Sequence, residues 1–154
     1  MEKKMGKKYR DADLILKLYD LRREEVMRKA RSWYIGEFEP ETVEDVQKAA
    51  LGEHGAYYRM VVSYWNMAAS MVNNGAIDEK MFSQANGEER VVYAKIEPFI
   101  DEMRSFAGTP DYLRNLEQLV MAEPGSKAEM AKLRERMKKY KAMRQETSAK
   151  AQGA

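Results

Sequence analysis

The sequence predicts an all-α protein: an irregular helical bundle of four to five main helices around a central buried helix, with a basic C-terminal helix. Three observations predict this class. Apolar residues recur at three- and four-residue steps, recognisable caps and breaks separate the periodic segments, and no stretch alternates as a half-buried strand does. The 154 residues, 44% of them hydrophobic and 34% charged, suit one soluble domain with one core.

The N-terminal part predicts an arm followed by a long helix. Residues 1–10 are charged, contain Gly6 and show no periodicity, so we expect a flexible basic arm. After the arm, apolar residues recur every three or four positions, and Asp11 or Asp13 is the predicted N-cap. This pattern predicts one amphipathic helix over about 12–35.

A short helix is predicted to follow Pro40. Thr42 and Asp45 have the spacing of a capping box, and the apolar pattern ends before Gly52. A second glycine, Gly55, follows closely, and each glycine inside a helix costs about 1 kcal/mol. We therefore expect a break between this short helix and the next one.

The central helix is predicted over about residues 56–74. Apolar residues, Trp65 among them, occupy most of its circumference, which is typical of a buried helix. Gly75 fits the left-handed position that ends a helix.

A narrow polar seam remains on this helix. Its members are spaced four, three, four and three residues apart: Arg59, Ser63, Asn66, Ser70 and Asn73. We interpret the seam as the slice of the helix that reaches solvent or bonds to a neighbouring helix. A groove for a peptide or a small polar ligand is the alternative, and these five residues are its partner-binding candidates.

Two further helices are predicted after the central one. Asp78 caps a short helix, and an apolar stripe then runs over about 88–107. Pro98 lies inside the stripe, which keeps its phase across the proline. We expect one kinked helix in which the proline frees the carbonyl of Ala94.

The last two helices carry start signals of their own. Thr109 and Pro110 predict the N-cap and first position of a helix over about 110–122. Ser126 and Glu129 predict a capping box for the C-terminal helix.

Three parts of the chain follow from these patterns: the arm (1–10), a helical bundle domain (11–122), and a basic C-terminal helix with a tail that frays past Arg144 (123–154).

Charge is segregated along the chain. Residues 1–10 carry five Lys/Arg and one Glu, and residues 127–154 carry nine Lys/Arg and three Glu. Because the whole chain has a net charge of +2, residues 11–126 carry −8. An acidic body with two basic ends is the strongest electrostatic feature of the sequence.

Several chemistries are absent from the sequence. Without cysteine there is no disulfide, thiolate zinc site, iron–sulfur cluster or thiol nucleophile. No window reaches the roughly 18 apolar residues of a membrane span, and the N-terminal stretch lacks the apolar region of a secretory signal. We expect a cytoplasmic protein with no metal and no cofactor.

His54 is the only histidine. We interpret it as a turn residue between two glycines. The alternative is a general base or metal ligand acting with Glu53 and with a carboxylate such as Asp78 or Glu88.

The order of features from Tyr64 to Leu119 resembles an uncharacterised bacterial all-helical family, a domain of unknown function. The matching features are a helix that ends in NGAID, the later stretch Ile96-x-Pro98-x-Ile100-x-x-x-Arg104, and the closing Tyr112-Leu113 to Leu119. The resemblance implies a small helical module with no assigned reaction.

The leading interpretation is a non-enzymatic interaction module that binds a protein partner or copies of itself, through the polar seam or the basic last helix. The alternative is binding of nucleic acid or an anionic surface by the basic ends. The basic-surface candidates are Lys132, Arg136, Lys138, Lys139, Lys141 and Arg144. An enzyme is the third interpretation, and it would use His54 with a carboxylate.

Overall fold

The computed structural model describes residues 2–153, with side chains from Gly6 onward. All regular structure in this part of the chain is helical, so the predicted all-α class is confirmed. The elements are α1 (Glu2–Arg23), α2 (Glu25–Gly36), α3 (Val43–Leu51), α4 (Gly55–Asn73), α5 (Glu79–Ala85), α6 (Glu88–Ile96), the 3₁₀ turn η1 (Glu97–Phe99), α7 (Ile100–Ala107), α8 (Arg114–Val120) and α9 (Ser126–Gln152).

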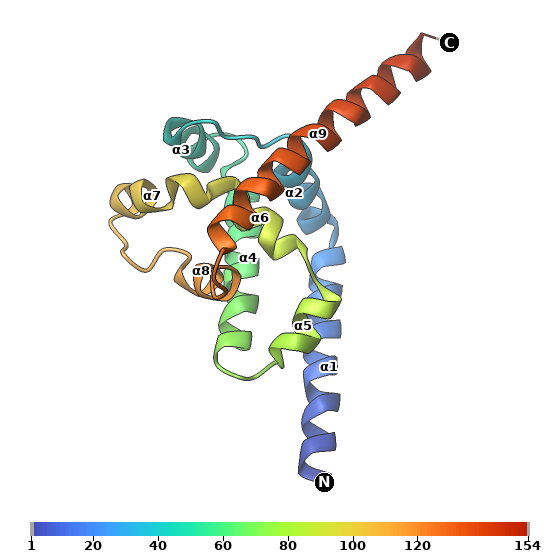
Figure 1. Ribbon diagram of the computed structural model, residues 1–154, viewed down its shortest axis with the longest axis vertical. Coiled ribbons are helices and arrows are strands. Elements are labelled where there is room, and N and C mark those ends of the chain that lie inside the picture. Colours follow the sequence, from blue (N-terminus) through green and yellow to red (C-terminus); the bar gives the residue numbers. More distant parts are fainter. Residues whose placement is uncertain (1, 154) are drawn as a thin grey trace.

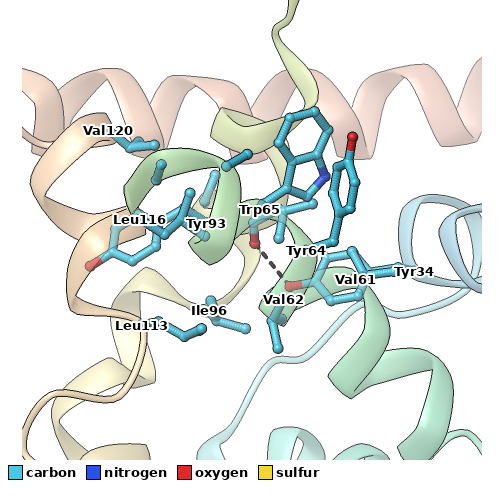
Figure 2. Close-up of a cluster of buried hydrophobic side chains, with 14 of the residues drawn as sticks. Tyr34, Val61, Val62, Tyr64, Trp65, Tyr93, Ile96, Leu113, Leu116 and Val120 are labelled. Atoms are coloured by element: carbon cyan, nitrogen blue, oxygen red, sulfur yellow. Dashed lines mark hydrogen bonds between the residues drawn. The ribbon is translucent and has the colours of Figure 1, made fainter. Parts of the chain in front are cut away.

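Helix α4 lies at the centre of the bundle, as its apolar circumference predicts. Helices α2 and α8 pack along it, and α3, α5 and α6 complete its surroundings (Figure 1). Trp65 is 1% exposed, and Val61 and Ala68 are fully buried. Figure 2 shows the side chains of α4 interleaved with those of α2, α6 and α8, where the Tyr34 hydroxyl donates a 2.9 Å hydrogen bond to the carbonyl of Val92.

The predicted end of α4 is confirmed. Gly75 has φ +75°, and its N–H donates to the carbonyl of Val72 at 2.9 Å. The N–H of Ala76 donates to the carbonyl of Met71 at 2.9 Å, so the two bonds together form a Schellman motif. Ile77, 1% exposed, then folds back onto the core.

The start of the chain differs from the prediction in two ways. The helix already begins at Glu2, where a flexible arm was expected, and it breaks at Glu24. The Glu24 carboxylate caps α2 by accepting from the N–H groups of Val26 and Met27. The prediction of one helix over 12–35 was therefore wrong.

The apolar stripe explains that break. One continuous helix with apolar residues at three- and four-residue steps would bury Leu21 and Val26, yet these side chains are 55% and 45% exposed. The buried residues are Leu18 in α1 and Met27 in α2, so the apolar face changes phase between the two helices.

The prediction that Asp11 or Asp13 is an N-cap was wrong, because both residues lie inside α1. Asp11 is 2% exposed, and its carboxylate accepts from Lys7 Nζ at 2.8 Å and from the N–H of Asp78 at 3.0 Å. Asp78 is the N-cap of α5. Asp11 therefore fastens α1 to the start of a helix far along the chain.

Pro98 interrupts its helix more strongly than predicted. A 3₁₀ turn separates α6 from α7, so the segment is two helices with a turn between them. Of the residues in the predicted apolar stripe, Ile96 before the turn is fully buried and Met103 after it is 3% exposed, whereas Phe106 near the end of α7 is 48% exposed.

The predicted N-terminal caps of α8 and α9 were also wrong. Residues 109–113 form turns, and α8 begins only at Arg114, preceded by Leu113 at φ +54°. Gly125 is the N-cap of α9, and the Ser126 hydroxyl donates backward to the carbonyl of Glu123. No capping box forms there.

Helix α9 has two halves with different surroundings. Its first half packs on α6 through Met130, which is fully buried. Its second half continues to Gln152 and projects beyond the bundle (Figure 1). The tail past Arg144 is helical, where fraying was expected. The free part of α1 projects at the opposite end of the molecule (Figure 1).

Candidate functional site

Each of the five side chains in the polar seam of α4 forms a hydrogen bond with the backbone of the protein itself. Arg59 donates to the carbonyl of Ala50 at 3.2 Å, where α3 ends. Ser63 and Ser70 donate to carbonyls of their own helix at 3.4 and 2.6 Å. These three side chains keep some contact with solvent.

Asn66 and Asn73 hold α8 against α4. The Asn66 amide oxygen accepts from the N–H of Leu116 at 3.0 Å, in the first turn of α8, and the Asn73 amide donates to the carbonyl of Asn115 at 2.9 Å. Leu113 offers no side-chain cap to α8, so Asn66 supplies one from the neighbouring helix. The seam is therefore partly covered by the protein's own helix, and a groove there remains a prediction without support.

The six basic candidates lie on α9, where they differ in pairing. Lys132, Lys138 and Lys141 form ion pairs with Glu129, Glu135 and Glu39, at 3.0, 3.5 and 2.9 Å. Within residues 6–153, no carboxylate forms an ion pair with Arg136, Lys139 or Arg144, and all three are exposed.

Apolar side chains stand among these cations. Residues 136–144 contain five Lys/Arg and no Asp/Glu. Tyr140 and Met143, three residues apart, are 66% and 64% exposed in the same segment. Lys141, through its bond to Glu39, is close to the point where α9 leaves the bundle, and residues 142–153 are exposed throughout.

His54 precedes α4 and stacks on an aromatic ring. Its imidazole lies 4.9 Å from the ring centre of Trp33, at an interplanar angle of 13°. Asp78 follows the far end of α4, a helix about 28 Å long at 1.5 Å per residue. Glu88 forms an ion pair with Arg31 and accepts from Trp65. Glu53, the neighbouring residue, has a carboxylate oxygen 3.7 Å from His54 Nδ1. Asp78 and Glu88, the more distant carboxylates considered as partners, are not assembled around the imidazole.

An open hollow of about 550 Å³ lies between η1, α7, α8 and α9. Charged side chains line it, and most of them pair with one another: Arg104 with Glu117 and Asp101, Arg114 with Glu117, and Arg134 with Glu97.

Arg104 is the buried member of this group, at 8% exposure, and also donates to the carbonyl of Tyr112 at 3.1 Å. Tyr93 donates to Glu117 at 3.2 Å. Since these cations are already neutralised, we interpret the hollow as a structural polar network that fixes α8.

Glu117 is held ionised in this network. Burial alone would raise its pKa, but the hydrogen bond and the charge of Arg104, with the charge of Arg114, hold the pKa of the Glu117 carboxyl below its usual value. The carboxylate is therefore a stabilising partner for the buried guanidinium.

Arg134 supplies a hydrogen-bond donor to the carbonyl that Pro98 leaves without one. The proline frees the carbonyl of Ala94, as predicted, and Arg134 on α9 donates to that carbonyl at 2.9 Å. The same guanidinium donates to Glu97 at 3.1 Å. The break in the α6–α7 segment thus provides the attachment point for α9.

Lys95 is a buried charge that the sequence prediction missed. It is 6% exposed, and its ammonium donates to the carbonyls of Tyr34, Ile35 and Phe38, at 2.9, 3.0 and 2.5 Å. Burial lowers the pKa of Lys95 to about 8, so the charged form still predominates at pH 7. Its three N–H groups match three acceptors at the end of α2. The signal in the sequence was a single lysine inside the apolar run VVYAKI.

The family model described as "Domain of unknown function (DUF4760)" matches residues 9–122. This match confirms the resemblance to an uncharacterised family and extends it over most of the chain. No curated protein and no solved structure matches.

Residues 2–153 include no helix with the length and apolar content needed to cross a membrane. They also include no group of three or more His, Asp or Glu side chains that could hold a metal ion.

Replacing Arg134 with Met should lower the free energy of unfolding by about 2 kcal/mol, because a buried carbonyl loses its donor and Glu97 loses its partner. Urea unfolding followed by circular dichroism measures this change. The matched control is Arg136→Met on the exposed side of α9, which should stay within about 0.5 kcal/mol of the original chain. Equal effects of the two substitutions would refute the role of Arg134.

Stability should fall with acid partly through Glu117. A carboxyl whose pKa is lower in the folded state stabilises the fold above its unfolded pKa, and this stability is lost as the pH falls through the folded pKa. Glu117→Gln should therefore cost about 2 kcal/mol at pH 7 and progressively less toward pH 3, roughly the range in which carboxyls titrate.

The control for this series is Glu135→Gln, because Glu135 forms an exposed ion pair with Lys138. Its cost should be small at every pH. Urea unfolding over a pH series tests both variants, and a cost of Glu117→Gln that does not change with pH would contradict the assignment.

Proposed function

We propose that this chain, which belongs to the DUF4760 family, is a non-enzymatic interaction module that presents the projecting part of α9 to an acidic groove of a protein partner. The observation that carries the proposal is the segment 136–144, where unpaired cations and exposed apolar side chains occur together on a helix that leaves the bundle.

The charge of the segment selects the partner. Arg136, Lys139 and Arg144 are exposed and form no ion pair within the described chain, so their charges are available. A partner surface with carboxylates would attract this helix and accelerate its association. The attraction would weaken as the salt concentration rises.

The apolar residues of the segment suit a groove. Tyr140 and Met143 are three residues apart and therefore neighbours on one side of the helix. Helices that dock in grooves use such anchors, spaced three or four residues apart, while surrounding charges set the orientation. An aromatic ring and a methionine would fill an apolar floor whose rim is acidic.

Nucleic-acid binding is the second candidate, because Lys132, Arg136 and Lys139 are spaced four and three residues apart and share one exposed face. Such a row of cations suits phosphates. This row of cations has one exposed aromatic neighbour, Tyr140, whereas surfaces that bind single-stranded nucleic acid usually carry several aromatic side chains. We therefore place this candidate second.

Two α9 variants separate the candidates. The charge variant is Arg136→Glu with Lys139→Glu, and the apolar variant is Tyr140→Ala with Met143→Ala. The control is Lys17→Glu with Lys29→Glu, two exposed lysines outside α9. Each purified protein, with cross-linking, is used to capture partners from cells of the source organism.

The proposal predicts one captured protein that is reduced at least about tenfold by both α9 variants and retained by the control. Capture that does not depend on either α9 variant would contradict it. Fluorescence anisotropy with a 20-nucleotide DNA or RNA tests the second candidate. Binding that is steeply salt-dependent, lost in the charge variant and kept in the apolar variant would favour nucleic acid instead.

A further inference from the structure

The N-terminal part of α1 projects at the opposite end of the molecule from the projecting part of α9 (Figure 1). An exposed apolar stripe runs along this helix. Tyr9, Leu16 and Tyr19 are 73%, 61% and 46% exposed, and Ala12 lies between them. The steps of three, four and three residues are those of the a and d positions of a coiled coil, with Tyr9 and Leu16 at a and Ala12 and Tyr19 at d. We call these four residues the α1 stripe.

The stripe faces away from the bundle. Helix α1 is fastened to the body by Asp11, which bonds to the N–H of Asp78, and by the carbonyl of Leu18, which accepts from the Tyr64 hydroxyl at 2.5 Å. At 3.6 residues per turn, the α1 stripe lies roughly 130° around the helix from these two residues. A second helix can therefore approach the stripe without meeting the body of its own chain.

The charges beside the stripe are complementary in one orientation. Lys8, Ile15 and Arg22 occupy the g positions on one flank, and Asp13 and Asp20 the e positions on the other. Arg22 donates to Asn86 and Ile15 packs against the core, so the g flank presents the charge of Lys8. Asp13 also pairs with Lys17 of its own helix at 3.2 Å, an exposed pair that Lys8 of a second copy would join. In a parallel pair, the g flank of one helix meets the e flank of the other, which places Lys8 opposite Asp13 of the second copy. An antiparallel pair would bring the e flanks of the two copies together, and with them the aspartates of both copies.

We propose that two copies of this chain associate in parallel through the α1 stripe. The stripe covers about one and a half heptads, less than the three or four of a lasting coiled coil, so the dimer is a weak and reversible one. This inference goes beyond the function proposed for α9 and does not rest on it. A parallel pair would send both copies of α9 toward the same side, so that two weak docking events reinforce each other.

Sedimentation velocity of the full chain from about 10 to 500 µM tests association in the range expected of a small interface. The mass should rise from 17.9 kDa toward twice that value. Leu16→Asp should abolish the rise, whereas Leu51→Asp should keep it, because Leu51 is also exposed (73%) but lies on α3. Circular dichroism checks that both variants remain folded.

Cysteine cross-linking tests the orientation, since the chain has no cysteine of its own. In a parallel pair, position 12 of one copy faces position 12 of the other, so Ala12→Cys should form a disulfide dimer under mild oxidation. Lys17→Cys, on another side of α1, should not. A mixture of Ala12→Cys and Leu16→Cys chains that cross-links where Ala12→Cys alone fails would show an antiparallel pair.

Four outcomes would overturn the proposal: a mass that stays at the monomer value over the whole range, equal loss of association in Leu16→Asp and Leu51→Asp, cross-linking at position 17 as efficient as at position 12, and the antiparallel cross-link.

Discussion

The structure depends on one constraint, the nearly complete burial that α4 requires. Tyr58, Val61, Trp65, Ala68 and Val72 are all at most 7% exposed and lie at successive turns of this helix. No single neighbour can cover a helix that is apolar on most sides, so α2, α8, α3, α5 and α6 all pack against it. The other helices then pack on these, α1 on α2 and α5, and α9 on α6.

Side chains from distant parts of the chain cap the helix ends in this bundle. A helix leaves unpaired N–H groups at its start and unpaired carbonyls at its end, and short helices have many such ends for their length. Charged or amide side chains from other helices satisfy them while they join the two elements. Four residues act in this way: Asp11 for α5, Asn66 for α8, Lys95 for α2 and Arg134 for α6.

These caps from distant residues explain why some helix ends can be predicted from the sequence and others cannot. Local signals were sufficient where the cap lies within its own turn, as at Gly75 and in the capping box of Thr42 with Asp45. They were insufficient at Thr109 and Ser126, because the first turn of α8 is capped from α4 and α9 is fixed to the freed carbonyl of Ala94. The site candidates differ in the same way. The exposed cations of α9 can be predicted from composition. The hydrogen bonds of Asn66 and Asn73 to α8 depend on how distant helices pack, and the sequence does not show this.

Helix α4 is the enclosed axis on which the other elements assemble, and native-state hydrogen exchange can test this role. The amides of Val61 to Val72 should exchange only through global unfolding, with the same free energy as the urea transition. Amides in residues 2–10 and 142–152, which project beyond the bundle, should exchange far faster. If α4 exchanged through local opening while α1 or α9 remained protected, this role of α4 would be contradicted.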